Sequence, residues 1–374
     1  MHSNEKGHEE GESVIVNLPQ SGLDRSEGTA HLNATDIKRR KELANNVHLP
    51  VIKSVTLAGT YVLASMAYYF CISYSKLNYI YSVAPLVAMT EVVKMAICIA
   101  LKYCIDGELI PQTILLSDTR GELWKRGLPY VIPAFLYAVY NNMTFINLDN
   151  FDLGTYQVFM QTRIWFTGIV FTVVLGQALS LRKWLALTLL AFGVTLKYFS
   201  PSTFEMGSWV GIVILQAFIS SLAGVYNEYM FKKDPGFSIH MQNFFMYFYG
   251  IVFNILFGVV LVPNFGRELT VGISQTRIFV VIVLVGAVTG ITASFILKFT
   301  NIIVKALASG VEVPLTAIMA AILLGERLCA QDVVAAVMVM LAIYMYYTKG
   351  FGDSRLINLN FRKRERLNVV SQEV

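Results

Sequence analysis

Two similar hexapeptides, LGQALS at residues 175–180 and LGERLC at residues 324–329, lie 149 positions apart, and each stands between two long apolar runs. The run after the first ends in KY at 197–198, and the run after the second ends in YY at 346–347. The chain therefore contains two related halves. Each half holds five apolar runs, an odd number, so the second half would cross a membrane in the opposite direction to the first. Such inverted repeats are typical of transporters, because exchanging the conformations of two similar halves opens a central site to each side in turn.

The composition is that of a membrane protein. Of 374 residues, 55% are hydrophobic and 15% are charged, and the mean hydropathy is +0.55, which an ordinary soluble domain seldom reaches. Residues 54–348 carry only 31 of the 55 charged side chains. We expect this transporter domain to comprise repeat one at about 54–199 and repeat two at about 207–348. Residues 1–53 lack hydrophobic periodicity and predict a disordered tail with no cleavable signal peptide, and residues 349–374 form a basic tail.

Ten apolar runs approach the roughly 20 helical residues that cross about 30 Å of hydrocarbon. They are Val55–Ser73, Tyr79–Tyr103, Gly127–Asn147, Gly154–Leu175, Trp184–Phe199, Ser208–Met230, Ile239–Val262, Ile278–Leu297, Ile302–Leu324 and Val333–Tyr347. The sequence thus predicts an all-α membrane protein with ten transmembrane helices arranged as two inverted five-helix repeats.

An even number of spans places both termini on one side of the membrane. The loops on that side and the C-terminal tail carry most of the basic residues: Arg120, Lys125, Arg126, Arg182, Lys183, Lys232, Lys233, Arg355, Arg362, Lys363, Arg364 and Arg366. The opposite loops offer mainly Lys76, Arg267, Arg277 and Arg327. By the positive-inside rule, both tails are predicted to be cytosolic.

Several classes of function have little support. The four cysteines show no CxxC spacing, and four of the five histidines lie in the N-terminal tail. A metal site, a disulfide framework and histidine-based catalysis are therefore not indicated, and we expect no catalytic residues, metal or cofactor. Basic loops and tails explain the net charge of +5, so nucleic acid is not an expected partner. The oligomeric state stays open, a homo-oligomer included.

Polar side chains inside the spans are the candidate site. Inserting one charged side chain into a membrane costs about 2.5–3.5 kcal/mol of free energy, so such groups usually face a cavity or a partner. They are Glu91, Lys94, Asn141, Asn142, Gln157, Gln161, Arg163, Asn227, Glu228, Asn243, Lys298, Lys305 and Glu312. Arginine and lysine suit phosphate, asparagine suits a nucleobase or sugar, and the aromatic faces of Tyr137, Tyr156, Tyr226 and Tyr247 suit stacking. The set fits an anionic nucleotide or another phosphorylated solute.

Some of these groups have structural interpretations that the sequence leaves open. Glu91 and Lys94 are three residues apart on one helix and could neutralise each other. Arg163 and Glu312 occupy equivalent positions in the two repeats and could form a central ion pair. Asn227 and Glu228, beside two lysines, fit a solvated interface as well as a ligand site.

Longer motifs carry a family resemblance. They are YAVYNN at 137–142, NFDLGTYQVFMQTR at 150–163, GVYNE at 224–228, QN at 242–243 with Tyr247, and KFTNIIVK at 298–305. In this order, from about residue 55 to 348, the chain resembles the nucleotide-sugar transporters that include the CMP-sialic acid, UDP-galactose and UDP-N-acetylglucosamine carriers.

The resemblance implies the ten-helix fold of the drug/metabolite transporter superfamily and an antiporter in the Golgi membrane or the endoplasmic reticulum membrane. Such a carrier exchanges cytosolic nucleotide sugar for luminal nucleoside monophosphate, and UDP-sugars are the expected substrates, followed by CMP-sialic acid. The expected substrate-binding residues are Tyr137, Asn141, Asn142, Tyr156, Gln157, Arg163, Tyr226, Asn243, Tyr247, Lys298, Asn301 and Lys305.

Two positions depart from the family pattern. Arg163 stands where lysine is usual, and Asn301-Ile302 replaces an Asp-Asn pair, which removes an acid near Lys298 and Lys305. The base preference therefore cannot be carried over. Open alternatives are a carrier of another phosphorylated metabolite or a drug on the same fold, and a receptor or scaffold that transports nothing.

Overall fold

The computed structural model describes residues 51–78, 83–107, 110, 120–151, 153–201, 204, 209–234, 236–261, 277–324 and 327–348. All regular structure in these ranges is helical. The predicted tails lie outside them, apart from residues 51–53.

The helices follow the predicted spans closely. In chain order they are α2 (Val51–Asn78), α3 (Val83–Asp106), α5 (Arg120–Gly127), the 3-10 turn η1 (Leu128–Tyr130), α6 (Val131–Asn150), α7 (Leu153–Met160), α8 (Thr162–Leu175), α9 (Leu181–Tyr198), α10 (Val210–Lys233), α11 (Ile239–Leu261), α13 (Arg277–Phe299), α14 (Ile302–Leu324) and α15 (Ala330–Tyr347). Each predicted span overlaps at least one of them, and the fourth overlaps both α7 and α8, which meet at Gln161.

Length and composition identify seven helical segments of the described residues as able to cross a membrane. The helices α3, α6 and α9 are outside that set. Charged side chains explain the exclusion of α9, which contains Arg182, Lys183 and Lys197. The described part of the chain is thus all-helical, with seven candidate membrane spans, and the count of ten stays a prediction.

The first hexapeptide connects α8 with α9, and the described residues of the second, 324 and 327–329, lie at the end of α14 and before α15. Gly176 ends α8 with a φ of 64°, a left-handed conformation that glycine adopts at little cost. Ser180 then begins α9, and its hydroxyl accepts a hydrogen bond from the Lys183 N–H. In the second copy, Cys329 begins α15, and the Asp332 carboxylate accepts a 2.9 Å hydrogen bond from the Cys329 N–H.

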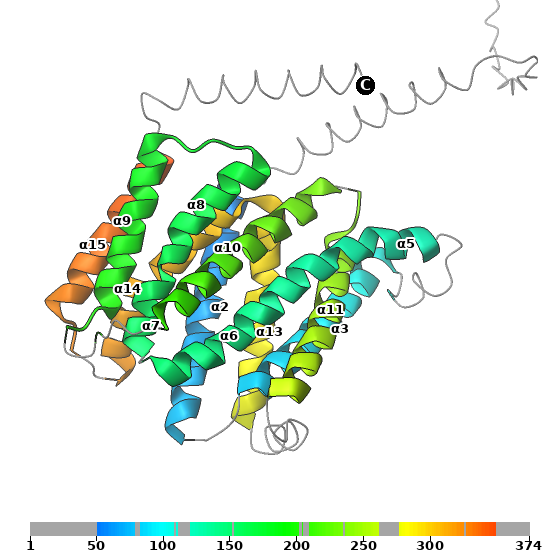
Figure 1. Ribbon diagram of the computed structural model, residues 1–374, viewed down its shortest axis with the longest axis horizontal. Helices are drawn as coiled ribbons and strands as arrows, with labels where there is room; N and C mark the ends of the chain where they lie inside the picture. Colours follow the sequence, from blue (N-terminus) through cyan, green and yellow to red (C-terminus); the bar gives the residue numbers. More distant parts are fainter. Residues whose placement is uncertain are drawn as a thin grey trace, which may run out of the picture.

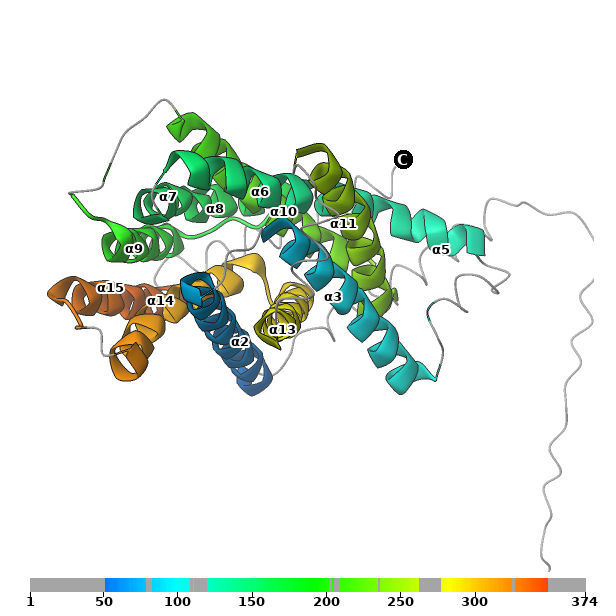
Figure 2. The same ribbon diagram turned by 90° about the horizontal axis from the view of Figure 1, so that it is seen from below.

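The helices pack in pairs that recur when the two halves are exchanged. The helix α2 packs against α13 and α14, and α10 packs against α6 and α8. Likewise α3 packs against α13, and α11 against α6. Two further pairs join equivalent helices of the two halves: α9 with α15 at one edge of the bundle, and α3 with α11 at the other (Figures 1 and 2).

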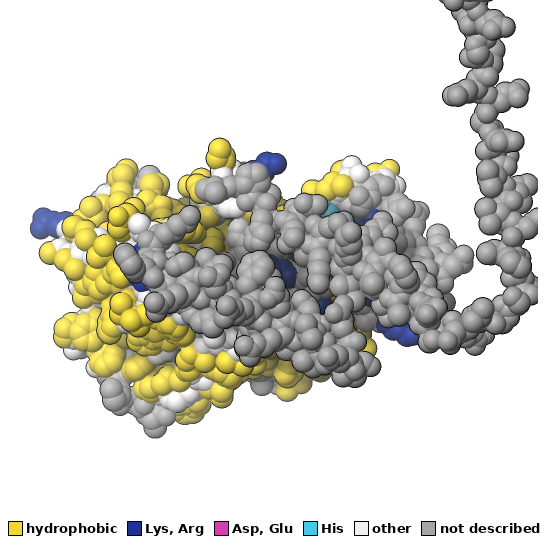
Figure 3. Space-filling model, turned by 90° about the horizontal axis from the view of Figure 1, so that it is seen from above, with side chains coloured by type: hydrophobic (Ala, Val, Ile, Leu, Met, Phe, Trp, Pro, Cys, Tyr) yellow, Lys and Arg dark blue, Asp and Glu magenta, His cyan; other side chains and the backbone are white. Residues whose placement is uncertain are grey.

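Helices α9 and α15 run antiparallel. At one end, Arg182 Nε donates a 2.8 Å hydrogen bond to the carbonyl of Met345. At the other end, Lys197 forms an ion pair with Asp332, and Gln331 donates a 2.9 Å hydrogen bond to the carbonyl of Phe199. The outer face of α15 is apolar and exposed, as expected for a surface in contact with lipid. Apolar side chains dominate the described surface in Figure 3 as well.

Glycines allow close contacts in the centre of the bundle. A Cβ on Gly286 of α13 would lie 2.8 Å from the Tyr68 ring of α2, and one on Gly290 would lie 2.8 Å from Lys94 of α3. This GxxxG spacing therefore brings α13 close to both neighbours, as such motifs do in membrane proteins.

Candidate functional site

A cavity of about 510 Å³, which we call the large cavity, lies between helices of both halves. Its volume is within the range of small-molecule sites, about 300–1,000 Å³. Hydroxyl, amide and charged groups dominate its lining: Tyr61, Ser65, Tyr68, Tyr69, Tyr137, Tyr140, Gln157, Gln161, Arg163, Thr167, Tyr198, Ser220, Lys305, Ser309, Glu312 and Thr316. An apolar ligand could form no hydrogen bonds with these groups, so the cavity suits a polar one.

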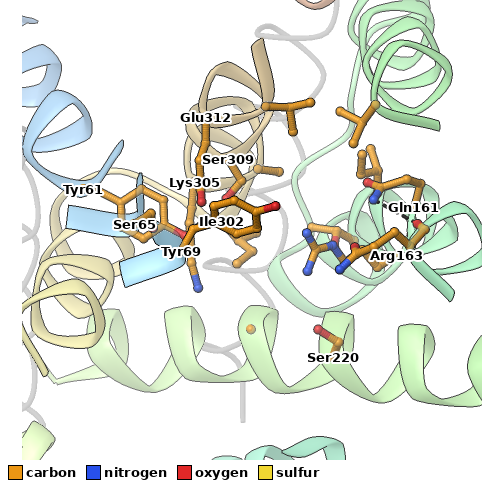
Figure 4. Close-up of a pocket in the computed structure, with 18 of the residues that line it drawn as sticks. Tyr61, Ser65, Tyr69, Gln161, Arg163, Ser220, Ile302, Lys305, Ser309 and Glu312 are labelled. Atoms are coloured by element: carbon orange, nitrogen blue, oxygen red, sulfur yellow. Dashed lines mark hydrogen bonds between the residues drawn. The ribbon is translucent and has the colours of Figure 1, made fainter. Parts of the chain in front are cut away.

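Arg163 and Lys305, the two residues expected to bind phosphate, face each other across this cavity. Figure 4 shows Arg163 entering from α8 and Lys305 entering from α14 on the opposite side. Arg163 is the second residue of α8, directly after the break at Gln161, whose side chain donates a 3.1 Å hydrogen bond to the carbonyl of Gln157. The cavity therefore receives one cation from each half of the chain.

The start of α14 is fixed by side chains around Lys305. Asn301 Oδ1 accepts a 2.8 Å hydrogen bond from the Val304 N–H, and Glu228 Oε2 accepts one of 2.7 Å from the Ile302 N–H. These bonds satisfy N–H groups of the first turn, which have no partner within a helix. Asn301, predicted to bind substrate, acts here as a helix cap one turn before Lys305.

A smaller cavity of about 260 Å³ adjoins the large one, and Tyr137, Tyr140 and Lys305 line both. It holds Glu91 and Lys94, which form an ion pair and so confirm that the two residues neutralise each other. The Lys94 ammonium also lies 4.6 Å from the centroid of the Tyr247 ring, a cation–π contact.

Amide groups also line this smaller cavity, from Asn141, Asn227 and Asn254. Within the described part of the chain, Asn227 Oδ1 is buried and has no hydrogen-bond partner. A buried acceptor of this kind is available to a donor of a ligand, such as a base or sugar group.

The structure brings six of the twelve predicted residues to the two cavities. They are Tyr137, Asn141, Gln157, Arg163, Tyr247 and Lys305. The other six lie outside both linings, and the side chains of three of them are hydrogen-bonded to backbone groups. Asn142 Nδ2 donates to the carbonyl of Ala138 at 2.8 Å, Lys298 Nζ donates to the carbonyl of Phe231 and to Gln242, and Asn301 caps α14.

The remaining three have different surroundings. Tyr156 packs in an apolar cluster with Phe151, and Thr144 and Gln216 lie at its hydroxyl. The Tyr226 ring lies 6.0 Å from that of Tyr229. Asn243 is fully buried, and its side-chain nitrogen and oxygen have no hydrogen-bond partner among the described residues. A substrate role for these six residues stays a prediction.

Two open interpretations can now be compared with the geometry. Arg163 and Glu312 line one cavity, but they form no ion pair in the described part of the chain. Glu228 is not solvated, because it is buried and forms a 2.7 Å ion pair with Lys232. It also lies outside the linings of both cavities. Its role is to connect α10 with the start of α14.

Sequence reasoning missed the contribution of α2. Tyr61, Ser65, Tyr68 and Tyr69 line the large cavity from that helix. Their spacing of four, seven and eight residues from Tyr61 places them on one face of an otherwise apolar span, and this polar stripe was the signal available in the sequence.

Comparisons with known proteins agree with this geometry. The family model described as nucleotide-sugar transporter matches residues 48–347. The UDP-galactose transporter senju of Drosophila melanogaster is 32% identical over 311 residues, covering 72% of this chain and 79% of the relative. CMP-sialic acid transporter 2 of Oryza sativa subsp. indica is 29% identical over 300 residues, covering 78% and 82%.

The fold of the chain is similar to that of a solved structure. One crystal structure superposes with a TM-score of 0.61 over 80% of this chain and 97% of that chain, at 10% sequence identity. At that identity the similarity shows the fold alone.

Proposed function

Since the chain belongs to the nucleotide-sugar transporter family, we propose that it is an antiporter that exchanges a cytosolic nucleotide sugar for a nucleoside monophosphate. The observation that carries the proposal is the pair of cations, Arg163 and Lys305, on opposite walls of one polar cavity. Arginine offers a planar fork of donors and lysine a point charge, and both suit phosphate oxygens. The phosphates would lie between them.

The smaller cavity extends this arrangement. Tyr137 and Tyr140 stand where the two cavities adjoin and offer aromatic faces to a base, while Asn141 and Asn227 offer amide donors and acceptors. A nucleotide sugar has a base, phosphate and a sugar in a row, and two adjoining cavities, with Lys305 where they meet and Arg163 in the larger one, would accommodate such a ligand. Binding it would require contacts from both halves.

The same two charges would couple the movement of the carrier between its two states to the presence of a bound ligand. A ligand that neutralises Arg163 and Lys305 lowers the cost of moving them between the two states, whereas an empty carrier moves uncompensated charge. The inverted repeat that this mechanism requires is supported by the helix pairs that recur on exchange of the two halves. We place the protein in the Golgi membrane, with the endoplasmic reticulum as the alternative, and both termini in the cytosol.

A UDP-sugar is the substrate that we favour, because the relative with 32% identity is named as a UDP-galactose transporter. CMP-sialic acid is the second candidate, because the Oryza relative with similar coverage is named for that substrate.

Exchange in reconstituted vesicles tests the proposal. Vesicles are loaded with UMP, CMP or GMP, or left empty, and uptake of labelled UDP-galactose and CMP-sialic acid is measured. We expect faster uptake into vesicles that contain the matching monophosphate, and little uptake by Lys305→Ala. The control is Lys125→Ala, which removes an exposed lysine of α5 outside both cavities. Equal uptake by loaded and empty vesicles would refute obligatory exchange, and no uptake of any nucleotide sugar would refute the function.

A further inference from the structure

Glu312 places a carboxylate in a cavity otherwise suited to anions. Lys305, Ser309, Glu312 and Thr316 of α14 all line the large cavity, at a spacing that keeps them on one helix face. Seven residues separate Lys305 from Glu312, which corresponds to about 10 Å along the helix axis. Figure 4 shows Lys305 and Glu312 from this face, with Ser309 between them.

The groups around Glu312 come from three other helices. Ser65 of α2 lies against the carboxylate, Arg163 of α8 attracts it, and Tyr198 of α9 stands near both charged groups. Tyr61, Tyr68 and Tyr69 of α2 and Tyr137 and Tyr140 of α6 are the other titratable side chains of the lining, and α10 contributes only Ser220 and Gly224. Among the described residues that line this cavity, Arg163, Lys305 and Glu312 are the charged ones.

The net charge of the cavity depends on whether Glu312 is ionised and whether a ligand is bound. With Glu312 ionised, the lining has a net charge of +1, since two cations face one anion. UDP-galactose and CMP-sialic acid are both dianions at neutral pH. A bound dianion leaves a net charge of −1 if Glu312 stays ionised and zero if Glu312 carries a proton. Because uncompensated charge inside a membrane protein is costly, the neutral complex is favoured.

We propose that Glu312 takes up a proton from water when a dianionic nucleotide sugar binds, and releases it when the ligand leaves, so that ligand binding is linked to protonation. This inference rests on the proposed function. Exchange of one dianion for another then moves no net proton, whereas uptake into an empty vesicle carries a proton with the substrate. In the empty carrier, the ionised carboxylate offsets part of the charge of Arg163 and Lys305.

Calorimetry on the purified full chain measures this linkage. Titrating UDP-galactose and CMP-sialic acid in buffers with different ionisation enthalpies gives the number of protons bound per ligand. Neither ligand has a group of its own that titrates near neutral pH. For the unmodified protein we expect uptake of about one proton, with an affinity that falls up to about tenfold for each unit of rising pH above neutrality.

Glu312→Gln is the decisive variant, because glutamine resembles the protonated carboxyl in shape and charge. It should bind the same ligand with proton uptake near zero and with an affinity independent of pH. Glu122→Gln, an exposed position of α5 outside both cavities, should behave as the unmodified protein. If Glu312→Gln does not fold, the proton count of the unmodified protein still decides the question. Binding without proton uptake overturns this inference alone, and the absence of binding overturns the proposed function with it.

Discussion

The Glu228 carboxylate accepts a 2.7 Å hydrogen bond from the backbone N–H of Ile302, the first residue of α14. The same carboxylate forms an ion pair with Lys232, which in turn donates a hydrogen bond to the carbonyl of Thr300. Lys305 follows Ile302 within the first turn of α14. The last turns of α10 therefore hold the helix end that presents Lys305 to the cavity.

Replacement of Glu228 tests this connection. Glu228→Ala should destabilise the fold by about 1–3 kcal/mol, because it leaves a buried N–H without a partner and removes one of the two acceptors of Lys232. Thermal unfolding in detergent measures the change. Glu228→Gln should lie between Ala and the unmodified protein, since its amide oxygen can still accept from Ile302. A melting temperature for Glu228→Ala equal to that of the unmodified protein would contradict the role of this carboxylate.

A glycine on the same helix tests the packing beside the cavity. A Cβ on Gly224 of α10 would lie 2.8 Å from Ile302 Cδ1, and Gly224 also lines the large cavity. Gly224→Ala should therefore displace the Ile302 side chain, lower stability by about 1 kcal/mol and weaken ligand binding. Melting temperature and nucleotide affinity are the two measurements.

Gly211→Ala is the matched control on α10, because nothing lies within 4 Å of a Cβ at that position. It should stabilise the helix by up to about 1 kcal/mol. If Gly224→Ala shifted the melting temperature in the same direction as Gly211→Ala, the proposed contact with Ile302 would be wrong.

Much of the helical frame follows from hydrophobic runs and turn signals. The apolar runs predict the positions of the long helices, and in LGQALS, which separates two of these runs, Gly176 ends α8 and Ser180 begins α9. The break at Gln161 was not predicted, because the run from Gly154 to Leu175 is continuously apolar enough to read as one helix. Local composition does not encode such a break.

The cavity lining was predictable only in part. Arg163 and Lys305 stand out because a charge is rare in an apolar span. Lys298, at the end of a span, stands out for the same reason, and Asn301 is expected from the family motif. Both instead bond to backbone and side-chain groups at the ends of helices. A polar residue of a span and a capping residue look alike in sequence, and helix packing is needed to distinguish them.

The geometry of the arginine side chain gives a further prediction. Arg163→Lys retains the charge but loses the planar fork and shortens the reach across the cavity, so nucleotide affinity should fall by about tenfold. Arg163→Gln should lose more, because the charge is removed as well. Equilibrium binding of UMP, CMP and GMP measures both effects. Equal affinities for the lysine variant and the unmodified protein would show that Arg163 acts only as a point charge.

Whether both cations hold the same phosphate can be decided by a double-mutant cycle. The affinity for the nucleoside monophosphate, which has a single phosphate group, is measured for Arg163→Ala, Lys305→Ala and the double variant. If one phosphate bridges the two walls of the cavity, the losses should be non-additive, with a coupling of about 0.5–3 kcal/mol. The cycle of Arg163→Ala with Lys125→Ala is the control and should be additive, since Lys125 lies outside both cavities. Additive losses in the first cycle would mean that the two cations bind separate groups, and a single phosphate would then not connect the two halves.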